Sequence, residues 1–228
     1  MTRKPILALL VPLVAAVTLV LPAPDASAQS EGEAKEKTKA HDTEEGEALK
    51  AEVGQKAPDF VLTDTEGNEH RLSAYLKEEK VVVLEWFNPD CPFVKKHHKN
   101  TRSMAETYAL AKEHDVVWLA INSGAPGKQG AGLERNKKAI EEFKIEYPVL
   151  LDESGKVGKA YGAKTTPHMY VIDKDGTLVY AGAIDDKSNT TDLGETNYVK
   201  GALEQCLAGE KVDPATTKPY GCSVKYAS

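Results

Sequence analysis

The stretch VLEWFNPDCPFV, residues 83–94, decides the fold of this chain. Its first four residues are the end of a near-continuous apolar run, Val81 to Trp86. Such a run is typical of a strand covered on both faces. The segment Asn88-Pro89-Asp90 favours a turn, and Pro92 suits the first position of a helix. We therefore predict a buried strand, a turn and a helix that opens at Cys91.

The rest of the chain alternates between strand and helix patterns. Short apolar runs predict strands, two of them joined by an Asp175-Gly176 hairpin turn, and apolar residues spaced by three and four predict helices. This order predicts an α/β fold in which a central mixed β-sheet carries helices on both faces. The main strands are expected at 81–86, 116–122, 169–172 and 177–181, and the main helices at 92–114, 133–143 and 198–207.

Four segments are expected along the chain. Residues 1–28 combine two basic residues, an apolar run and the motif Ala26-Ser27-Ala28, which predicts an export signal cleaved after Ala28 and a periplasmic or extracellular protein. The alternative is an uncleaved membrane anchor. Residues 29–52 hold almost no large apolar side chain and predict a charged, disordered linker. A folded domain is expected at 53–208, followed by an exposed and mobile tail at 209–228.

Composition argues against several classes of protein. The chain has 29 Lys and Arg against 35 Asp and Glu, and its formal net charge of -6 argues against nucleic-acid binding. Its three cysteines are too few for a disulfide scaffold. Neither a phosphate-binding glycine loop nor a dense metal motif is visible, so no cofactor is expected. No membrane association is expected once the export signal has been cleaved.

Cys91 is the candidate nucleophile. A helix start presents unpaired backbone N–H groups and the positive end of the helix dipole, and both favour the thiolate, which is the reactive form of cysteine. Asp90 and Pro92 on either side predict a position near the surface. The alternative is a buried structural cysteine without reactivity.

Two motifs resemble the signatures of thioredoxin-fold proteins. Residues 83–94 resemble their active-site strand, turn and helix, and Thr165-Thr166-Pro167 resembles their cis-proline segment. More closely, residues 91–94, 166–169 and 221–226 are similar to the peroxiredoxin-like branch of the alkyl hydroperoxide reductase and thiol-specific antioxidant superfamily. The resemblance implies a thioredoxin-like fold and a thiol-dependent oxidoreductase or antioxidant. Its substrates would be disulfides, sulfenic acids or peroxides, with a reducing partner that the sequence does not identify.

The same resemblance implies roles for individual residues. The Thr166–Pro167 bond would be cis and would face Cys91, and the Thr166 backbone would contact the substrate. Pro92 and His168 would line the same pocket, and His168 could tune the reactivity of the cysteine there.

Two departures from the family patterns qualify this expectation. Thioredoxins carry a second cysteine where this chain has Val94, so a disulfide within the helix cannot form. Typical peroxiredoxins place Thr or Ser three residues before the reactive cysteine, where this chain has Asn88, and this puts peroxidase activity in doubt.

Cys222 is the candidate resolving cysteine, because a single reactive cysteine needs a second thiol to release its oxidised products. The alternatives for Cys222 are a static disulfide with Cys91, a bridge between chains, or an idle thiol. Cys206 lies on the apolar face of a predicted helix and is expected to be a small buried hydrophobe.

Two further polar residues fall at apolar positions. Glu85, an acid inside a buried strand, is a candidate for proton transfer, and a charge at a sheet edge is the alternative. His97 is expected to be a hydrogen-bonded core histidine. Two other classes of function stay open. One is a metal-handling module that uses Cys91 with His97 or His168, and the other is a non-catalytic thioredoxin-fold binding module.

Overall fold

The computed structural model describes residues 50–227. The predicted export signal and nearly all of the predicted linker lie outside this range. Within it, no helix combines the length and the apolar character that a membrane span needs.

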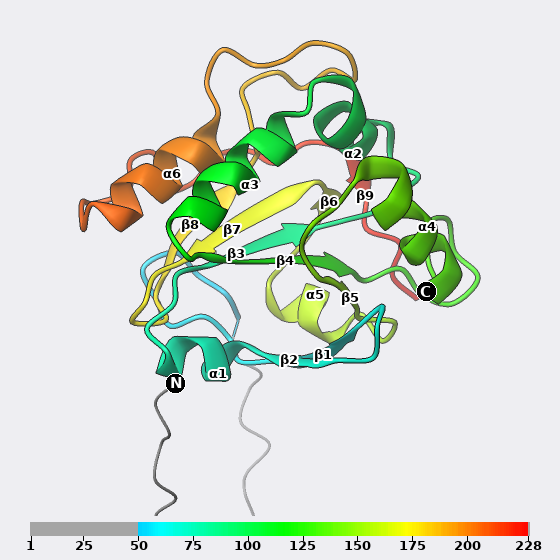
Figure 1. Ribbon diagram of the computed structural model, residues 1–228, viewed down its shortest axis with the longest axis horizontal. Helices are drawn as coiled ribbons and strands as arrows, with labels where there is room; N and C mark the ends of the chain where they lie inside the picture. The colour runs from blue at the N-terminus through cyan, green and yellow to red at the C-terminus, as the bar shows by residue number, and fades with distance from the viewer. Residues whose placement is uncertain (1–49, 228) are drawn as a thin grey trace, which may run out of the picture. The chain divides into compact units, whose positions relative to one another are not determined.

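A mixed seven-stranded sheet forms the centre of the fold (Figure 1). Its spatial order is β2-β1-β5-β4-β3-β7-β8. The neighbours β3, β4 and β5 run parallel, whereas β7 and β8 on one side and β1 and β2 on the other pair antiparallel. The strands are β1 (Val61–Asp64), β2 (Glu69–Arg71), β3 (Val82–Trp86), β4 (Val117–Asn122), β5 (Val149–Leu151), β7 (His168–Ile172) and β8 (Leu178–Gly182).

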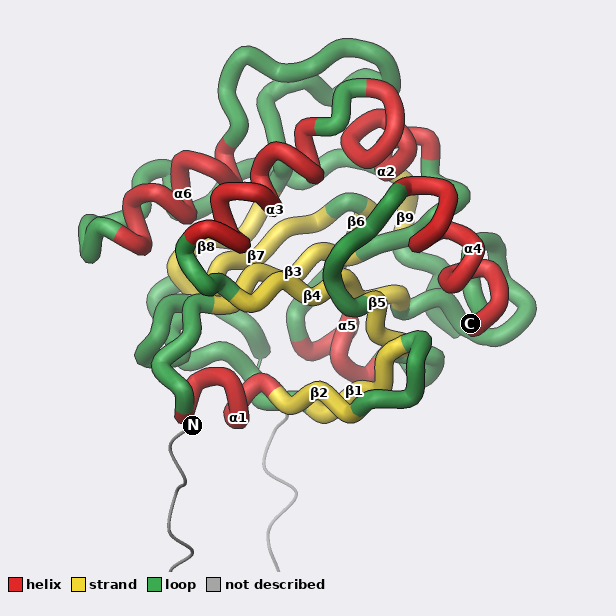
Figure 2. The backbone as a smooth tube through the Cα atoms, in the orientation of Figure 1, coloured by secondary structure: helices red, strands yellow, loops and turns green. Residues whose placement is uncertain are grey.

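Helices cover both faces of this sheet, as predicted (Figure 2). Because β3 is buried along its whole length, its side chains alternate between two apolar cores: Val83 belongs to one, and Val82 and Leu84 belong to the other. The first core is closed by α2 (Pro92–Lys95), α3 (Ser103–Glu113), α4 (Leu133–Phe143) and α6 (Tyr198–Leu207), and the second by α1 (Leu72–Lys77) and α5 (Lys156–Ala160).

The long helix predicted from Pro92 to His114 is interrupted. α2 ends at Lys95, a π-helical turn η1 (Lys96–Asn100) follows, and α3 begins only at Ser103, after Arg102 at a φ of 58°. Successive residues of an α-helix point about 100° apart, so three in a row do not share one buried face. The wider turn buries Lys96, His97 and His98 together, and each has a polar partner there.

The C-terminal tail is packed on the domain and is not the exposed, mobile segment predicted from the sequence. Its short strand β9 (Cys222–Ser223) pairs antiparallel with β6 (Thr165–Thr166) (Figure 1). The reason lies in its side chains: Val212 is buried, and Tyr220 and Val224 pack against the two cores. The apolar surface that these residues bury holds the tail in place.

Candidate active site

Cys91 lies in the core, not near the surface as predicted. It occupies the cap position before α2 and has no exposed surface, whereas Pro92 beside it is exposed. The Cys91 thiol donates to the Thr166 carbonyl oxygen, with 3.0 Å between sulfur and oxygen. The flanking residues indicated a turn at the surface correctly, but the cysteine side chain points inward from that turn.

The Thr166–Pro167 peptide bond is cis, as the resemblance implied. Thr166 forms part of β6 and directs its backbone carbonyl at the Cys91 sulfur. Its hydroxyl is buried and has no hydrogen-bond partner among the described residues. The site therefore contains one unsatisfied polar group, the Thr166 hydroxyl, on the same residue whose carbonyl oxygen accepts from Cys91.

Cys222 comes from the other end of the chain to the same place. It lies opposite Thr166 in the β6–β9 pair, and both Cys91 and Cys222 are free thiols. Burial, reinforced by contact with the Cys91 thiol, raises the pKa of Cys222 to about 12. Gly221 makes this approach sterically feasible, because a Cβ atom there would lie 2.1 Å from the Thr166 carbonyl oxygen.

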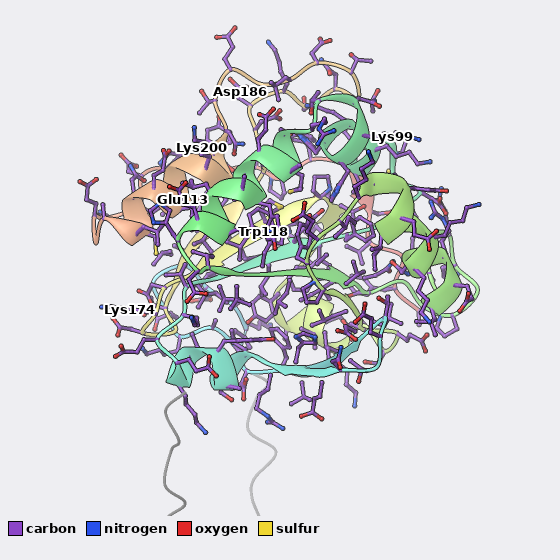
Figure 3. The ribbon with its side chains drawn as sticks, in the orientation of Figure 1. Lys99, Glu113, Trp118, Lys174, Asp186 and Lys200 are labelled. Carbon is purple, nitrogen blue, oxygen red and sulfur yellow. The ribbon has the colours of Figure 1, made fainter. Side chains whose placement is uncertain are left out.

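Glu85 is fully buried in the central strand β3, so it is not a charge at a sheet edge. It accepts hydrogen bonds from the Tyr147 hydroxyl at 2.9 Å and from Trp118 Nε1 at 3.4 Å. His98 Nε2 lies 2.7 Å from its other carboxylate oxygen. Trp118 lies between α3 and the sheet in Figure 3. Alternation along β3 places Glu85 on the sheet face that faces the Cys91 core.

His168 lies elsewhere than predicted. Alternation along β7 directs it to the sheet face that also carries Tyr170 and Trp86, opposite the face that contacts Cys91. Its Nδ1 is hydrogen-bonded to the Tyr170 hydroxyl at 3.0 Å, and burial lowers the pKa of His168 to about 4. The cis-proline fixes where the strand begins, but the pleat decides which way the next side chain points.

A polar cluster beside the site was not identified from the sequence. It consists of the buried Lys96 and His97 from the π-helical turn, the buried Asp185 from the loop after β8, and the half-buried Tyr220 from the tail, and we call it the tail latch. Lys96 Nζ lies 3.3 Å from Asp185 Oδ2, and Tyr220 donates to Asp185 Oδ1. His97 uses one ring nitrogen on Ser103 at 2.8 Å and the other on Tyr220 at 2.9 Å.

Protonation in the tail latch follows from burial. Burial lowers the pKa of His97 to about 3, although the Asp185 charge acts in the opposite direction. Burial by itself would raise the pKa of Asp185, but the hydrogen bonds from Tyr220 and from backbone N–H groups outweigh it and lower that pKa. His97 is therefore neutral and Asp185 is ionised, as expected for a hydrogen-bonded core histidine beside a buried ion pair.

Asn88 serves the loops around the site. Its side-chain amide donates to the Gln129 carbonyl oxygen at 3.1 Å, and its Oδ1 accepts from the Asp90 backbone N–H at 2.9 Å. Asp90 in turn pairs with Arg135 at 2.9 Å. Asn88 thus holds the 123–132 loop against the turn before Cys91, which is a structural task.

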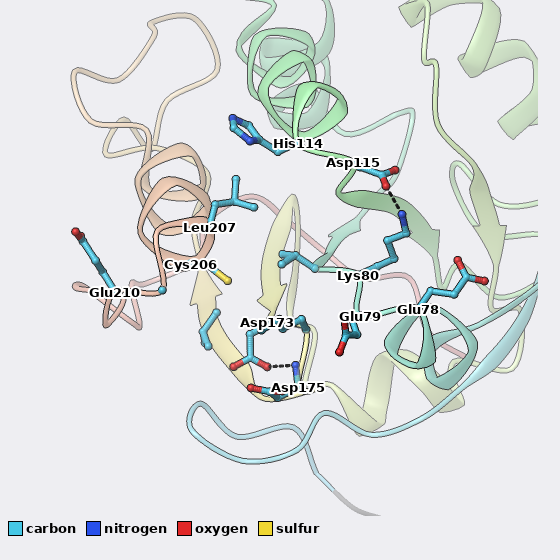
Figure 4. A pocket seen from close by; sticks show the side chains of 14 residues that line it. Glu78, Glu79, Lys80, His114, Asp115, Asp173, Asp175, Cys206, Leu207 and Glu210 are labelled. Carbon is cyan, nitrogen blue, oxygen red and sulfur yellow. Dashed lines mark hydrogen bonds and ion pairs between the residues drawn. The ribbon is translucent and has the colours of Figure 1, made fainter.

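Cys206 is remote from the other two cysteines. It is half-buried at the wall of a cavity of about 590 Å³ beside the start of β3, whereas Cys91 follows the end of that strand. Figure 4 shows its sulfur among charged side chains, including the Lys80–Asp115 pair. Burial raises the pKa of Cys206 to about 11. The sequence placed this residue correctly against the core, and the structure adds one exposed side.

No group of three or more metal-ligating side chains comes together anywhere in residues 50–227. His97 has both ring nitrogens engaged, and His168 lies across the sheet from Cys91. The described residues therefore do not gather the cysteine and histidines that the metal-handling alternative required.

The sheet order, the cis-proline segment and the cysteine after β3 define a thioredoxin-like α/β protein with two neighbouring thiols. The chain belongs to the Redoxin family, which matches residues 52–199.

The chain is also similar to individual proteins and solved structures. The thiol-disulfide oxidoreductase ResA of Geobacillus kaustophilus is 36% identical over 126 residues, which cover 55% of this chain and 66% of that protein, just under two thirds. The crystal structure of an uncharacterized conserved protein from the same species is 34% identical, with a TM-score of 0.67 over 77% of this chain and 93% of that one. A hypothetical protein from Sinorhizobium meliloti is 28% identical, with a TM-score of 0.69 over 78% and 96%.

Proposed function

We propose that the protein is an exported thiol-disulfide oxidoreductase in which Cys91 is the nucleophile and Cys222 is the resolving cysteine. The observation that carries this proposal is the meeting of two free thiols at the cis-proline segment, one held by the Thr166 carbonyl and the other opposite Thr166 in β9. The similarity to ResA supports the reaction class, and the composition of residues 1–28 supports export.

The order of the two thiols follows from their surroundings. Cys222 remains protonated at neutral pH because burial and the neighbouring Cys91 thiol raise its pKa to about 12. The reactive form in thiol–disulfide exchange is the thiolate. Cys222 is therefore the poorer first nucleophile. We assign the first attack on the substrate disulfide to Cys91, at the start of α2, and the second step, on the mixed disulfide, to Cys222.

Disulfides fit the site better than peroxides. The position at which typical peroxiredoxins carry a peroxide-binding Thr or Ser is occupied by Asn88, whose amide group is engaged with loop backbone. Arg135, the cation beside the active-site turn, is paired with Asp90. The substrate class that we propose is accordingly a disulfide, with sulfenic acids as the next candidate.

Trapping with Cys222→Ser tests the proposal. When the reduced wild-type protein is mixed with a stoichiometric disulfide such as oxidised glutathione, peptide mass spectrometry should find a Cys91–Cys222 bridge. Cys222→Ser should instead accumulate the mixed disulfide on Cys91. Cys206→Ser is the matched control and should behave like wild type. If Cys222→Ser gives the same products as wild type, Cys222 does not resolve Cys91.

A further inference from the structure

The tail segment 219–226 covers the backbone edge beside the reactive sulfur. Cys222 pairs with Thr166, and beyond it the Val224 backbone N–H donates to the Lys164 carbonyl oxygen at 3.1 Å. Cys91 contacts Cys222 of this segment and has no exposed surface. A protein substrate has no access to Cys91 while this segment stays in place.

The tail latch fastens this segment two residues before Cys222. The Tyr220 hydroxyl contacts Asp185 and His97, and it accepts from Lys96 Nζ at 3.4 Å. The Tyr220 ring packs edge-on against Phe93 of α2, with 5.8 Å between ring centroids. One tail side chain thus connects the tail to α2, the helix that follows Cys91.

The two charged groups on the domain side of the latch keep partners when Tyr220 leaves, and only the neutral His97 loses a hydrogen bond there, at Nε2. Asp185 keeps Lys96 at 3.3 Å and the backbone N–H groups of Lys187 and Gly194 at 3.1 and 2.8 Å. Lys96 keeps the Lys187 carbonyl oxygen at 2.6 Å. Release of the tail therefore leaves no buried charge without a partner, so it avoids the penalty that breaking a buried ion pair carries.

Space and backbone geometry also fit a movable tail. A cavity of about 370 Å³ lies along the tail and is lined by Tyr198, Pro219 and Tyr220, together with the loop that carries Asp185 and Asp186. Figure 3 labels Asp186 on that loop above the helices. The β6–β9 ladder is only two residues long. Beyond it the segment is held by the Val224–Lys164 bond, a 2.8 Å bond from the Ala125 backbone N–H to the Lys225 carbonyl oxygen, and the Tyr226 hydroxyl on the Ala163 carbonyl oxygen at 2.9 Å.

We propose that the backbone edge of β6 is a docking site for a segment of another protein. In the free protein, segment 219–226 occupies this edge and can be displaced from it, and Tyr220 sets how often the segment leaves. The partner that replaces it is an extended, cysteine-bearing segment of another protein. An edge strand with unpaired backbone groups accepts an added strand, and the register of Cys222 shows which position of that strand brings its sulfur to Cys91. This inference rests on the proposed function of the two cysteines.

The reaction with the docked partner is a two-electron thiol–disulfide exchange between the partner's disulfide and the Cys91–Cys222 pair. The Cys91 thiolate attacks one sulfur of the partner's disulfide, whose S–S bond breaks, and the second sulfur leaves as a thiolate that is protonated by water. When the tail returns, Cys222 loses its proton to water and attacks the Cys91 sulfur. The partner then leaves with both sulfurs reduced, and the Cys91–Cys222 disulfide retains the oxidising equivalents.

A single-thiol protein isolates the opening step. In the full chain with Cys206→Ser and Cys222→Ser, Cys91 is the only thiol, and the tail keeps its backbone pairing. The probe is a short extended peptide whose one cysteine carries thionitrobenzoate as a mixed disulfide. Attack by Cys91 on the peptide sulfur joins the peptide to the protein and releases coloured thionitrobenzoate. The release rate therefore reports how often Cys91 is uncovered.

Adding Tyr220→Phe to this protein should raise the release rate at least about tenfold, because it removes a hydrogen bond to a charged group. Gly221→Ala should also raise the rate, through a clash that leaves the latch intact. Tyr198→Phe, which removes a hydroxyl from the wall of the same cavity but not from the latch, should leave it unchanged. Thermal melting confirms that each variant is folded.

Three results have distinct meanings. Faster release for both tail variants, with Tyr198→Phe unchanged, supports the docking edge. Equal rates in all folded variants overturn the latch, while the reactivity of Cys91 still supports the proposed function. A Cys91 that reacts in none of the folded variants but does react after unfolding in urea contradicts the proposed function itself.

Discussion

Glu85 illustrates how much one buried side chain can hold together. Three side chains converge on its buried carboxylate: His98 from η1, Trp118 from β4, and Tyr147 from the loop before β5. Each buried donor that loses its partner costs about 1–3 kcal/mol. The stability of the core beneath Cys91 therefore depends on this acid, whatever its part in proton transfer.

Replacing Glu85 with Leu tests this dependence. The variant places an apolar side chain in the strand and leaves three buried polar neighbours without a hydrogen-bond partner. We therefore expect the free energy of unfolding to fall by about 3 kcal/mol or more. Urea denaturation at neutral pH measures it. Tyr147→Phe, which removes one donor and leaves Glu85 two partners, should cost only about 1 kcal/mol. A Glu85→Leu protein as stable as Tyr147→Phe would contradict this account.

At the residue scale, the sequence identified those functional residues whose neighbours in the chain form a recognisable local motif. Cys91 was found from its turn and helix start, and Thr166–Pro167 from its motif. Asp185 and Tyr220 were missed because their partners on the π-helical turn are distant in sequence. A lone Tyr or Asp in a loop carries no local pattern that would predict a buried hydrogen bond.

Among the elements, the β6–β9 pair depends on a residue without a side chain. Gly221 has a φ of 134°, and a Cβ there would lie 2.1 Å from the Thr166 carbonyl oxygen, a backbone atom that cannot move aside cheaply. The pairing that brings Cys222 to Cys91 is therefore specified by a glycine as well as by the tail latch.

Gly221→Ala should detach this strand without unfolding the domain. In hydrogen–deuterium exchange, the peptide that covers 219–226 should exchange faster, while peptides from β3 and β4 keep their protection. Gly209→Ala is the matched control, because Gly209 also has a positive φ, +70°, but nothing lies within 4 Å of its Cβ position. Unchanged protection of 219–226 in Gly221→Ala would show that the pair tolerates a methyl group.

The interruption of the predicted helix belongs to the same scale. The apolar spacing from Phe93 to Ala111 fits one continuous helix, so periodicity alone gives no sign of a break. What separates α2 from α3 is the burial of Lys96, His97 and His98 side by side. Apart from Ser103 at the start of α3, the partners that make this burial favourable come from β3, the loop after β8 and the tail, which no local pattern includes.

At the scale of the whole molecule, two buried histidines couple folding to pH. Burial lowers the pKa of His97 to about 3 and that of His168 to about 4, whereas an unfolded histidine titrates near about 6.5. As pH falls below about 6.5, the unfolded chain takes up protons that the folded one does not, so stability decreases. The stabilisation that the two neutral histidines give to the folded state is fully present above about pH 6.5 and declines as the pH falls toward 4.

Urea denaturation at pH 7 and pH 5 should reveal this loss. We expect the free energy of unfolding to fall by roughly 2–4 kcal/mol between these values, a window above the normal range of carboxyl groups. His168→Gln should reduce the fall by about half, whatever its stability at pH 7. His114→Gln is the control, because His114 is exposed and should leave the fall unchanged. A pH-independent stability would contradict the burial of both histidines in neutral form.

The overall architecture was the part that the sequence predicted best. Strand and helix periodicity led to a mixed sheet covered on both faces, and the structure and the family match confirm the thioredoxin-like fold. The packing of the tail escaped prediction because Val212, Tyr220 and Val224 are too far apart to form a helix or strand period. Their burial depends on surfaces that exist only after the rest of the domain has folded.

The distance along the chain from Cys91 to Cys222 has a consequence for biosynthesis. A chain made from its N-terminus exposes Cys91 and the cis-proline segment long before the strand that completes the site has been translated. The domain can therefore fold around Cys91 while its partner thiol is still absent. A product cut short before Gly221 would retain the seven strands of the sheet and Cys91 but would lack the Cys222 thiol with which to finish the exchange.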